Sequence, residues 1–144
     1  MRMWLPILLS VFLSAAGLGL RGETDKEVHA HKLVLDLAGA FSNDGFKMRD
    51  GHWSGTLKPH ENALIAVNLY AGNHYWFSVG AAEPAKKIDV AVYDETGRRV
   101  PTENYSDGEK AAAGFTPTTS GQYYVLVTLL DGGESAFCLV YSYK

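Results

Sequence analysis

The sequence of 144 residues is poor in cysteine and has no excess of positive charge. Cys138 is the only cysteine, which excludes a disulfide within the chain and a zinc site made of several cysteines. Thirteen Lys and Arg are outnumbered by sixteen Asp and Glu, giving a formal net charge of -3. The uniformly basic footprint of a nucleic-acid-binding protein is therefore missing, and we expect no nucleic acid as a partner.

The sequence also lacks the short motifs of common enzymes. It contains no Gly-x-Ser-x-Gly turn, no His-Glu-x-x-His pair and no glycine-rich phosphate loop. Cys138 lies among apolar neighbours near the C-terminus, where we expect a buried and unreactive thiol. We therefore predict a protein that is not an enzyme. The less favoured alternative is a small hydrolase that pairs His60 or His74 with a carboxylate.

The one long uncharged run lies at the N-terminus. Arg2 is followed by mainly apolar residues up to Leu13 and then by the small residues 14–17. This order is typical of a signal peptide, so we predict that residues 1–22 direct export and that the mature protein is secreted or periplasmic. The alternative is an uncleaved membrane anchor, but Pro6 interrupts the run and a spanning helix needs about 20 apolar residues. We expect no stable membrane span after cleavage.

Residues 23–45 are predicted to form an N-terminal helical segment. Thr24 and Glu27 have the spacing of a capping box, in which the two residues satisfy each other's backbone amides. Apolar residues then recur at intervals of three and four, as on one face of a helix: Ala30, Leu33, Val34, Leu37, Ala40 and Phe41. Gly45 can adopt the left-handed conformation that ends a helix. A strand over residues 31–37 remains the alternative, because short apolar runs fit both structures.

Residues 46–144 have the pattern of an antiparallel β-sandwich. Short runs of alternating apolar and polar residues are separated by clusters of Gly, Asn, Asp and Pro. We expect about eight strands in two packed sheets, with the runs 63–69 and 74–79 forming a hairpin. Five sets of residues are predicted to face inward: Ala63, Ile65, Val67 and Leu69; Tyr75, Phe77 and Val79; Ile88, Val90 and Val92; Tyr123, Val125, Val127 and Leu129; Phe137, Leu139 and Tyr141.

Three runs of this β region share the order and spacing of one known family. They are Tyr75-Trp76-Phe77-Ser78, then residues 88–94 with Gly97, then residues 115–117 leading to residues 120–127. Over residues 65–141 the chain resembles the bacterial pre-peptidase C-terminal domain. The resemblance implies a jelly-roll-like β-sandwich, commonly attached to secreted peptidases and similar in architecture to carbohydrate-binding modules. The chain departs from the family in having a helix in front and no peptidase attached.

Carboxylates gather at two places in the β region. Asp89, Asp94 and Glu95 flank one turn, and a second loop contains Glu103, Asp107 and Glu109. Several carboxylates together can supply the oxygen shell that Ca²⁺ requires, so we consider calcium at Asp89, Asp94 and Glu95 as the one candidate cofactor. The alternative is that Asp94 closes its turn through the backbone and that the other carboxylates keep an exported domain soluble.

Four aromatic residues are expected to point away from the sandwich core. If the inward sets above are correct, these four lie on outer surfaces: Tyr70, Trp76, Tyr93 and Tyr124. A row of exposed rings would stack on sugar rings, which suggests a carbohydrate-binding module. The alternative is that the rings lie under the helix or at a subunit contact.

Histidine offers a weaker candidate for a metal site. His29 and His31 are the closest pair, but residues two apart on a helix point to different sides. We therefore expect these histidines to be solvated.

Taken with the predicted signal peptide and the family resemblance, the sequence favours a non-catalytic exported β-sandwich. We expect it to bind or support a protein or polysaccharide of the bacterial cell envelope.

Overall fold

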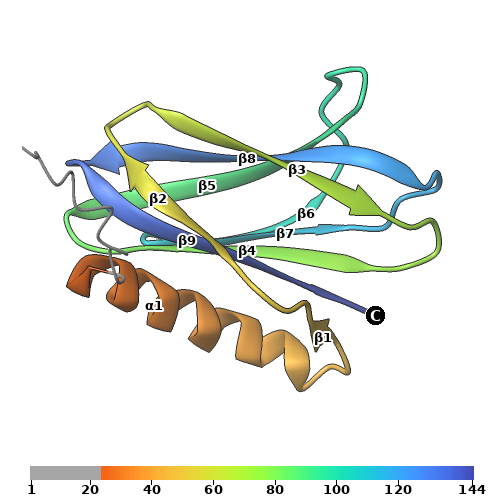
Figure 1. Ribbon diagram of the computed structural model, residues 1–144, viewed down its shortest axis with the longest axis horizontal. Helices are drawn as coiled ribbons and strands as arrows, with labels where there is room; N and C mark the ends of the chain where they lie inside the picture. The colour runs from red at the N-terminus through yellow and green to blue at the C-terminus, as the bar shows by residue number, and fades with distance from the viewer. Residues whose placement is uncertain (1–23) are drawn as a thin grey trace, which may run out of the picture.

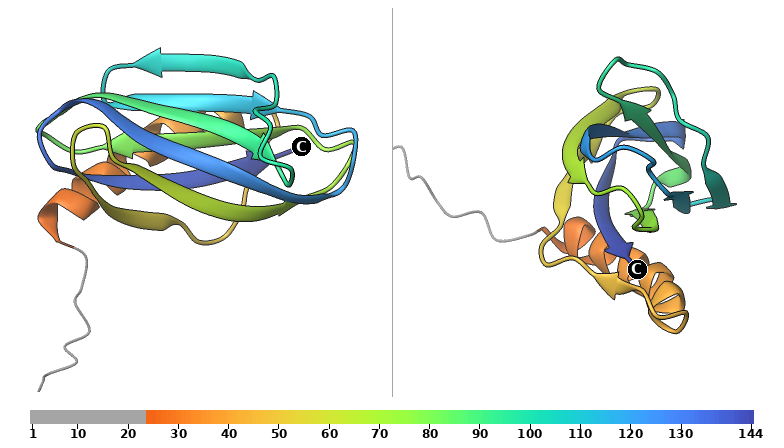
Figure 2. Two further views of the ribbon diagram at one scale, coloured as in Figure 1. Left: turned by 90° about the horizontal axis from the view of Figure 1, so that it is seen from above. Right: turned by 90° about the vertical axis from the view of Figure 1, so that its right-hand side faces the viewer.

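The computed structural model describes residues 24–144, which form two stacked β-sheets and one helix (Figure 1). The helix covers the outer face of one sheet, so the layers follow the order sheet, sheet, helix (Figure 2). The prediction of a mainly β, antiparallel sandwich preceded by one helix is confirmed, with nine strands instead of about eight. The predicted signal peptide, residues 1–22, lies outside the described residues.

The nine strands divide unequally between the sheets. Sheet A has the order β1-β9-β4-β7-β6, with β2 also paired to β9, and its strands are β1 (Lys47–Met48), β2 (Trp53–Leu57), β4 (Tyr75–Ala81), β6 (Glu103–Asp107), β7 (Lys110–Phe115) and β9 (Ser135–Tyr143). Sheet B has the order β3-β8-β5, and its strands are β3 (Asn62–Leu69), β8 (Gly121–Gly132) and β5 (Ala85–Asp94). All of these pairings are antiparallel.

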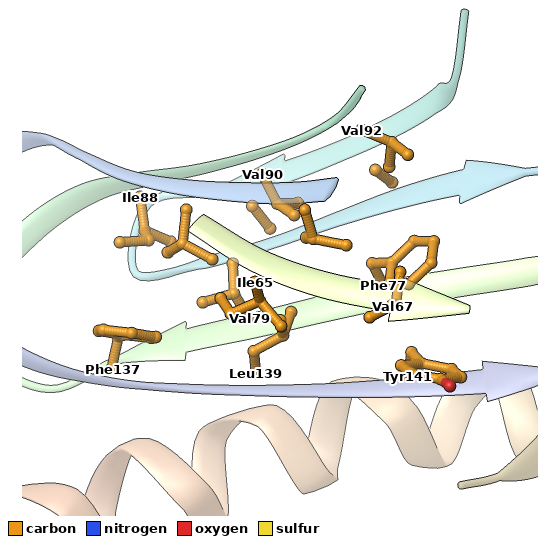
Figure 3. Close-up of a cluster of buried hydrophobic side chains, with 14 of the residues drawn as sticks. Ile65, Val67, Phe77, Val79, Ile88, Val90, Val92, Phe137, Leu139 and Tyr141 are labelled. Atoms are coloured by element: carbon orange, nitrogen blue, oxygen red, sulfur yellow. The ribbon is translucent and has the colours of Figure 1, made fainter. Parts of the chain in front are cut away.

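The core lies between the two sheets, as the alternation predicts. All five predicted inward sets meet there, and Ala63 is only partly buried. Figure 3 labels members of four of these sets in the space between the sheets. The rings of Phe77 and Tyr141 lie 5.2 Å apart across neighbouring strands of sheet A. Burial of apolar side chains on this scale supplies the main driving force for folding.

Helix α1 (Asp25–Ser42) begins at the predicted cap and ends one residue before Asn43. The backbone amide of Glu27 donates to Thr24 Oγ1 at 3.2 Å, and Gly45 adopts a positive φ of 89° just after the helix. The buried residues of the helix are Ala30, Val34 and Ala38. Ala40, which was expected on this face, is exposed, because the buried stripe follows the intervals 30, 34 and 38. In the described part of the chain, no helix is both long and apolar enough to cross a membrane.

Small residues allow the helix to approach sheet A closely. Helix α1 packs chiefly on β9 and β4, where a second buried cluster joins Ala30, Val34 and Ala38 to Ala82, Cys138 and Val140. At Gly80 of β4, an added Cβ would lie 2.9 Å from the carbonyl oxygen of Ala30 and 2.9 Å from the amide nitrogen of Val34. Gly80 is therefore the point at which the helix backbone touches the sheet. The prediction that Cys138 is buried is confirmed.

Two details of the predicted β region are wrong. The runs expected to form a hairpin become β3 in sheet B and β4 in sheet A, so the loop 70–74 crosses between the sheets. The predicted acidic loop contains strand β6, whose five residues are all exposed, and this strand forms a hairpin with β7 through Gly108. In β6 no apolar alternation marks a strand, because both faces of this edge strand are in solvent.

We expect Gly80→Ala to destabilise the protein by about 1–3 kcal/mol, because its methyl group would overlap the backbone of the helix. Gly39→Ala is the matched control: Gly39 lies on the exposed side of α1 with no atom within 4 Å of an added Cβ. This control should stabilise the protein by about 0.5–1 kcal/mol, since alanine favours a helix interior. Urea denaturation measures both. An equal change in the free energy of unfolding for the two variants would contradict close packing of the helix at Gly80.

Candidate functional site

A groove of about 750 Å³ opens at one end of the sandwich. One wall is the connection between β5 and β6, which projects at the upper right of Figure 1, and the other is the connection between β7 and β8. The right-hand view of Figure 2 faces this end of the molecule. The volume lies within the range of about 300–1,000 Å³ that is usual for small-molecule sites. We call this cavity the rim groove.

The lining of the rim groove is polar and acidic, with aromatic residues at its base. It contains no Lys or Arg, whereas three carboxylates line it, those of Asp94, Glu95 and Glu103. The half-buried ring of Phe115 and the buried ring of Tyr123 meet edge to face with centroids 5.3 Å apart. Hydroxyl and amide groups make up most of the remaining polar lining: Thr96, Thr102, Thr116, Thr118, Thr119, Ser120 and Gln122.

Asp94 holds the first wall in place. Its Oδ1 accepts hydrogen bonds from the Thr96 amide at 2.9 Å, the Thr96 hydroxyl at 2.6 Å and the Arg98 amide at 3.0 Å. The Thr96 hydroxyl and the Arg98 amide are the main reasons that the pKa of Asp94 lies below its ordinary value, since both favour the charged carboxylate. Gly97 closes the turn with a φ of 83°. The loop is thus fixed at its base by a charged hydrogen-bond acceptor.

The second wall is anchored by three hydrogen bonds. The hydroxyl of Tyr123 donates to the carbonyl oxygen of Thr119 at 2.6 Å. The Ala71 amide donates to Ser120 Oγ at 2.8 Å, and the Gly72 amide donates to the Pro117 carbonyl oxygen at 3.3 Å. These last two bonds tie the wall to the crossing loop after β3. Both walls of the rim groove are therefore ordered before any ligand arrives.

The three candidate calcium ligands are not drawn together. Asp94 and Glu95 line the rim groove, whereas Asp89 is half-buried on β5, about 16 Å away along an extended strand. Residues 24–144 contain no group of three or more His, Cys, Asp or Glu side chains that could hold a metal ion. Oδ1 of Asp94 is engaged in its turn, which is the role considered as the alternative. The calcium site stays a sequence-based prediction.

The four candidate aromatic residues are distributed over three parts of the surface. Tyr70 lies in the loop after β3 and is 65% exposed. Trp76 points outward from sheet A, where its ring stacks on Phe41 of the helix with centroids 4.4 Å apart. On β7, Gly114 contacts Trp76 so closely that an added Cβ would lie 2.9 Å from the indole ring. Contacts with Phe41 and Gly114 account for the outward position of the Trp76 ring without a ligand. This agrees with the alternative in which such rings lie under the helix.

Tyr93 and Tyr124 lie together on the outer face of sheet B, paired across β5 and β8. Leu126 is the next outward residue of β8 and pairs with Leu64 of β3 and Ala91 of β5. Leu64 is 61% exposed, and no helix of the described residues covers this sheet (Figure 2, left). We call Leu64, Ala66, Tyr93, Tyr124 and Leu126, together with Ala91, which is itself buried, the open face. Leu64 was not singled out from the sequence, although an apolar residue at an outward position of an alternating strand is a detectable signal.

The histidines occupy separate places. His74 lines the rim groove, but its ring packs against Phe46 and Trp76, with centroids 5.1 Å and 5.9 Å away. Within residues 24–144, no hydrogen bond or ion pair links the imidazole of His74 to a carboxylate, whereas a hydrolase built on this histidine would need such a pairing. His31 lies against His52, with ring centroids 4.3 Å apart. Sequence reasoning missed this contact, because it joins the helix to the loop before β2.

A comparison of the sequence with models of known protein families gives no match, and a search of curated proteins gives none. The resemblance to the pre-peptidase C-terminal domain therefore rests on the residues quoted for it, and the function is argued from the surfaces described above.

We expect the stability conferred by Asp94 to depend on pH. The pKa of Asp94 is lowered in the folded state, so its contribution is present above the ordinary carboxyl pKa and is lost as pH falls through the lowered value. Asp94→Asn keeps an acceptor oxygen but not the charge, and it should melt at a lower temperature than the original protein at neutral pH. The difference should close at strongly acidic pH. Thermal melts over that range measure the effect, and a difference that stays constant with pH would contradict the assignment.

Proposed function

We propose that this protein is a non-catalytic β-sandwich that is exported and binds another macromolecule at the bacterial cell envelope. The observation that carries the proposal is the open face, where large apolar side chains stand on the outside of sheet B with no element of the described residues over them. Exposed apolar patches of this kind mark interaction surfaces. Export is supported by the charge and apolar pattern of residues 1–22.

The arrangement of the open face supports a partner of large size. Cross-strand pairing places Leu64 beside Leu126 and Tyr93 beside Tyr124, so the apolar groups form a continuous band across all three strands of sheet B. Tyrosine combines a large apolar ring with a polar hydroxyl, a combination that is frequent at protein interfaces. A broad surface of this kind suits a protein or polysaccharide better than a small molecule. Similarity to a family of accessory domains of secreted peptidases supports the same role.

To test this proposal, the mature protein is mixed with the cell-envelope fraction of its own host, and the amount that stays bound is measured. We expect Leu64→Gln and Tyr124→Ser to reduce the bound amount at least tenfold, because both remove apolar contact area from the open face, Tyr124 on its central strand and Leu64 on β3. Leu35→Gln is the matched control, since Leu35 is an exposed leucine on the helix, on the other side of the molecule. Cosedimentation measures binding.

Two results would contradict this assignment. Equal loss for Leu35→Gln would show that retention depends on general hydrophobicity and not on the open face. A dimer in light scattering that Leu64→Gln and Tyr124→Ser convert into a monomer, with retention unchanged, would show that the open face is a subunit interface.

Carbohydrate binding is the second candidate, and Tyr93 with Tyr124 favours it. Their side chains lie next to each other on the outer face of sheet B, and aromatic faces attract the polarised C–H bonds of a sugar ring. In a polysaccharide pull-down, Tyr124→Ala should lose retention, whereas Trp76→Ala should keep it, because Phe41 and Gly114 flank the indole ring. Identical retention of the original protein and Tyr124→Ala would exclude a glycan on the open face.

A further inference from the structure

We propose that the rim groove is a second binding site, separate from the open face, and that it takes a short neutral carbohydrate. The groove is formed by two connections that are distant in sequence, residues 95–102 and 116–120, and its volume of about 750 Å³ accommodates a few sugar units. The site goes beyond the proposed function, which concerns a macromolecule on sheet B.

The charge of the groove selects against acidic ligands. Asp94, Glu95 and Glu103 line it, and no Lys or Arg does. A phosphate, sulfate or uronate would therefore meet three like charges in the lining, while the positive charge of Arg98, which acts on Asp94, lies outside the lining. Hydroxyl groups of a neutral sugar can instead donate hydrogen bonds to the carboxylate oxygens, which accept only. The acidic lining thus fits a ligand that is rich in hydroxyl donors.

The groups that would meet the ligand are available. No hydrogen bond or ion pair of the described residues engages the side chains of Glu95, Glu103 or Gln122, while Asp94 is used in its own turn. Glu95 and Glu103 extend from opposite ends of the first wall, and Gln122 belongs to the start of β8 on the other side. Planar carboxylate and amide groups on both sides can bind vicinal hydroxyls of one ring in pairs.

Apolar contact and rigidity complete the fit. The half-buried ring of Phe115 lies in the lining and offers an aromatic surface for the C–H face of a sugar. The walls are held by the Asp94 turn and by the bond from Tyr123 to Thr119, so little ordering accompanies binding. The lining is both aromatic and polar, and the walls are held by hydrogen bonds. We expect such a site to bind its ligand through several weak contacts.

Titration of the ¹⁵N-labelled mature protein with cellotriose, maltotriose and chitotriose tests the site by NMR. We expect at least one of these neutral trisaccharides to shift the amide signals of residues 94–103 and 115–122 in a saturable manner. Glu103→Gln and Thr118→Val should each weaken that binding about threefold to tenfold, since the first replaces a charged acceptor oxygen by an amide donor and the second removes a hydroxyl, both at exposed positions of the lining. Glu134→Gln, an exposed glutamate between β8 and β9, is the matched control and should bind unchanged.

The outcomes separate this site from the proposed function. Absence of saturable shifts with all three sugars, or shifts confined to Tyr93 and Tyr124, would overturn the rim groove as a carbohydrate site. Spermidine is the competing probe, and a stronger effect of this cation at the same residues would show that the acidic lining binds amines. Loss of envelope retention by the open-face variants is measured independently, so either hypothesis can fail while the other stands.

Discussion

Strand β9 is covered on both of its faces, and the three-layer arrangement depends on this constraint. Phe137, Leu139 and Tyr141 face the core between the sheets, while Cys138 and Val140 face the helix. A strand that is apolar on both sides is stable only between two apolar layers. The helix is therefore required by the sequence of β9, and the close approach at Gly80 of the neighbouring strand allows it to fill the space without a gap.

The outer faces of the two sheets differ in the size of their side chains. Under the helix, sheet A presents small residues such as Ser78 and Gly80, which allow a helix to lie against the sheet. The outer face of sheet B instead presents Tyr124 and Leu126, whose bulk would hold a helix backbone away. The helix thus has one sheet on which it can pack closely. Sheet B is left with an outer apolar face that no helix of the described residues covers.

Period-two alternation predicted the core correctly, because the inward positions of both sheets are apolar whichever sheet a strand joins. The same pattern carries no information on which sheet that is, so β3 and β4 were predicted to pair although the loop 70–74 crosses the sandwich. A finer signal exists in the outward positions. Along β3 they include Asn62 and Asn68, whereas along β9 all of them are small or apolar, and this contrast indicates which sheet the helix covers.

The rim groove could be predicted only in part for a related reason. Asp94 and Gly97 identify the turn from the sequence alone, since an aspartate that accepts backbone bonds and a glycine with positive φ are local features. The opposite wall is contributed by residues about 20 positions later, and the two meet because the chain crosses between the sheets at this end after β5 and after β7, as it also does in the loop 70–74 after β3. The first of these loops is tied to β5 by the bridge between Tyr93 and Arg99, and the second is tied to the loop after β3 by the bond from the Gly72 amide to the Pro117 carbonyl oxygen. The groove is thus a consequence of the sheet topology, and the hydrogen bonds of Asp94 and Tyr123 convert two such loops into fixed walls.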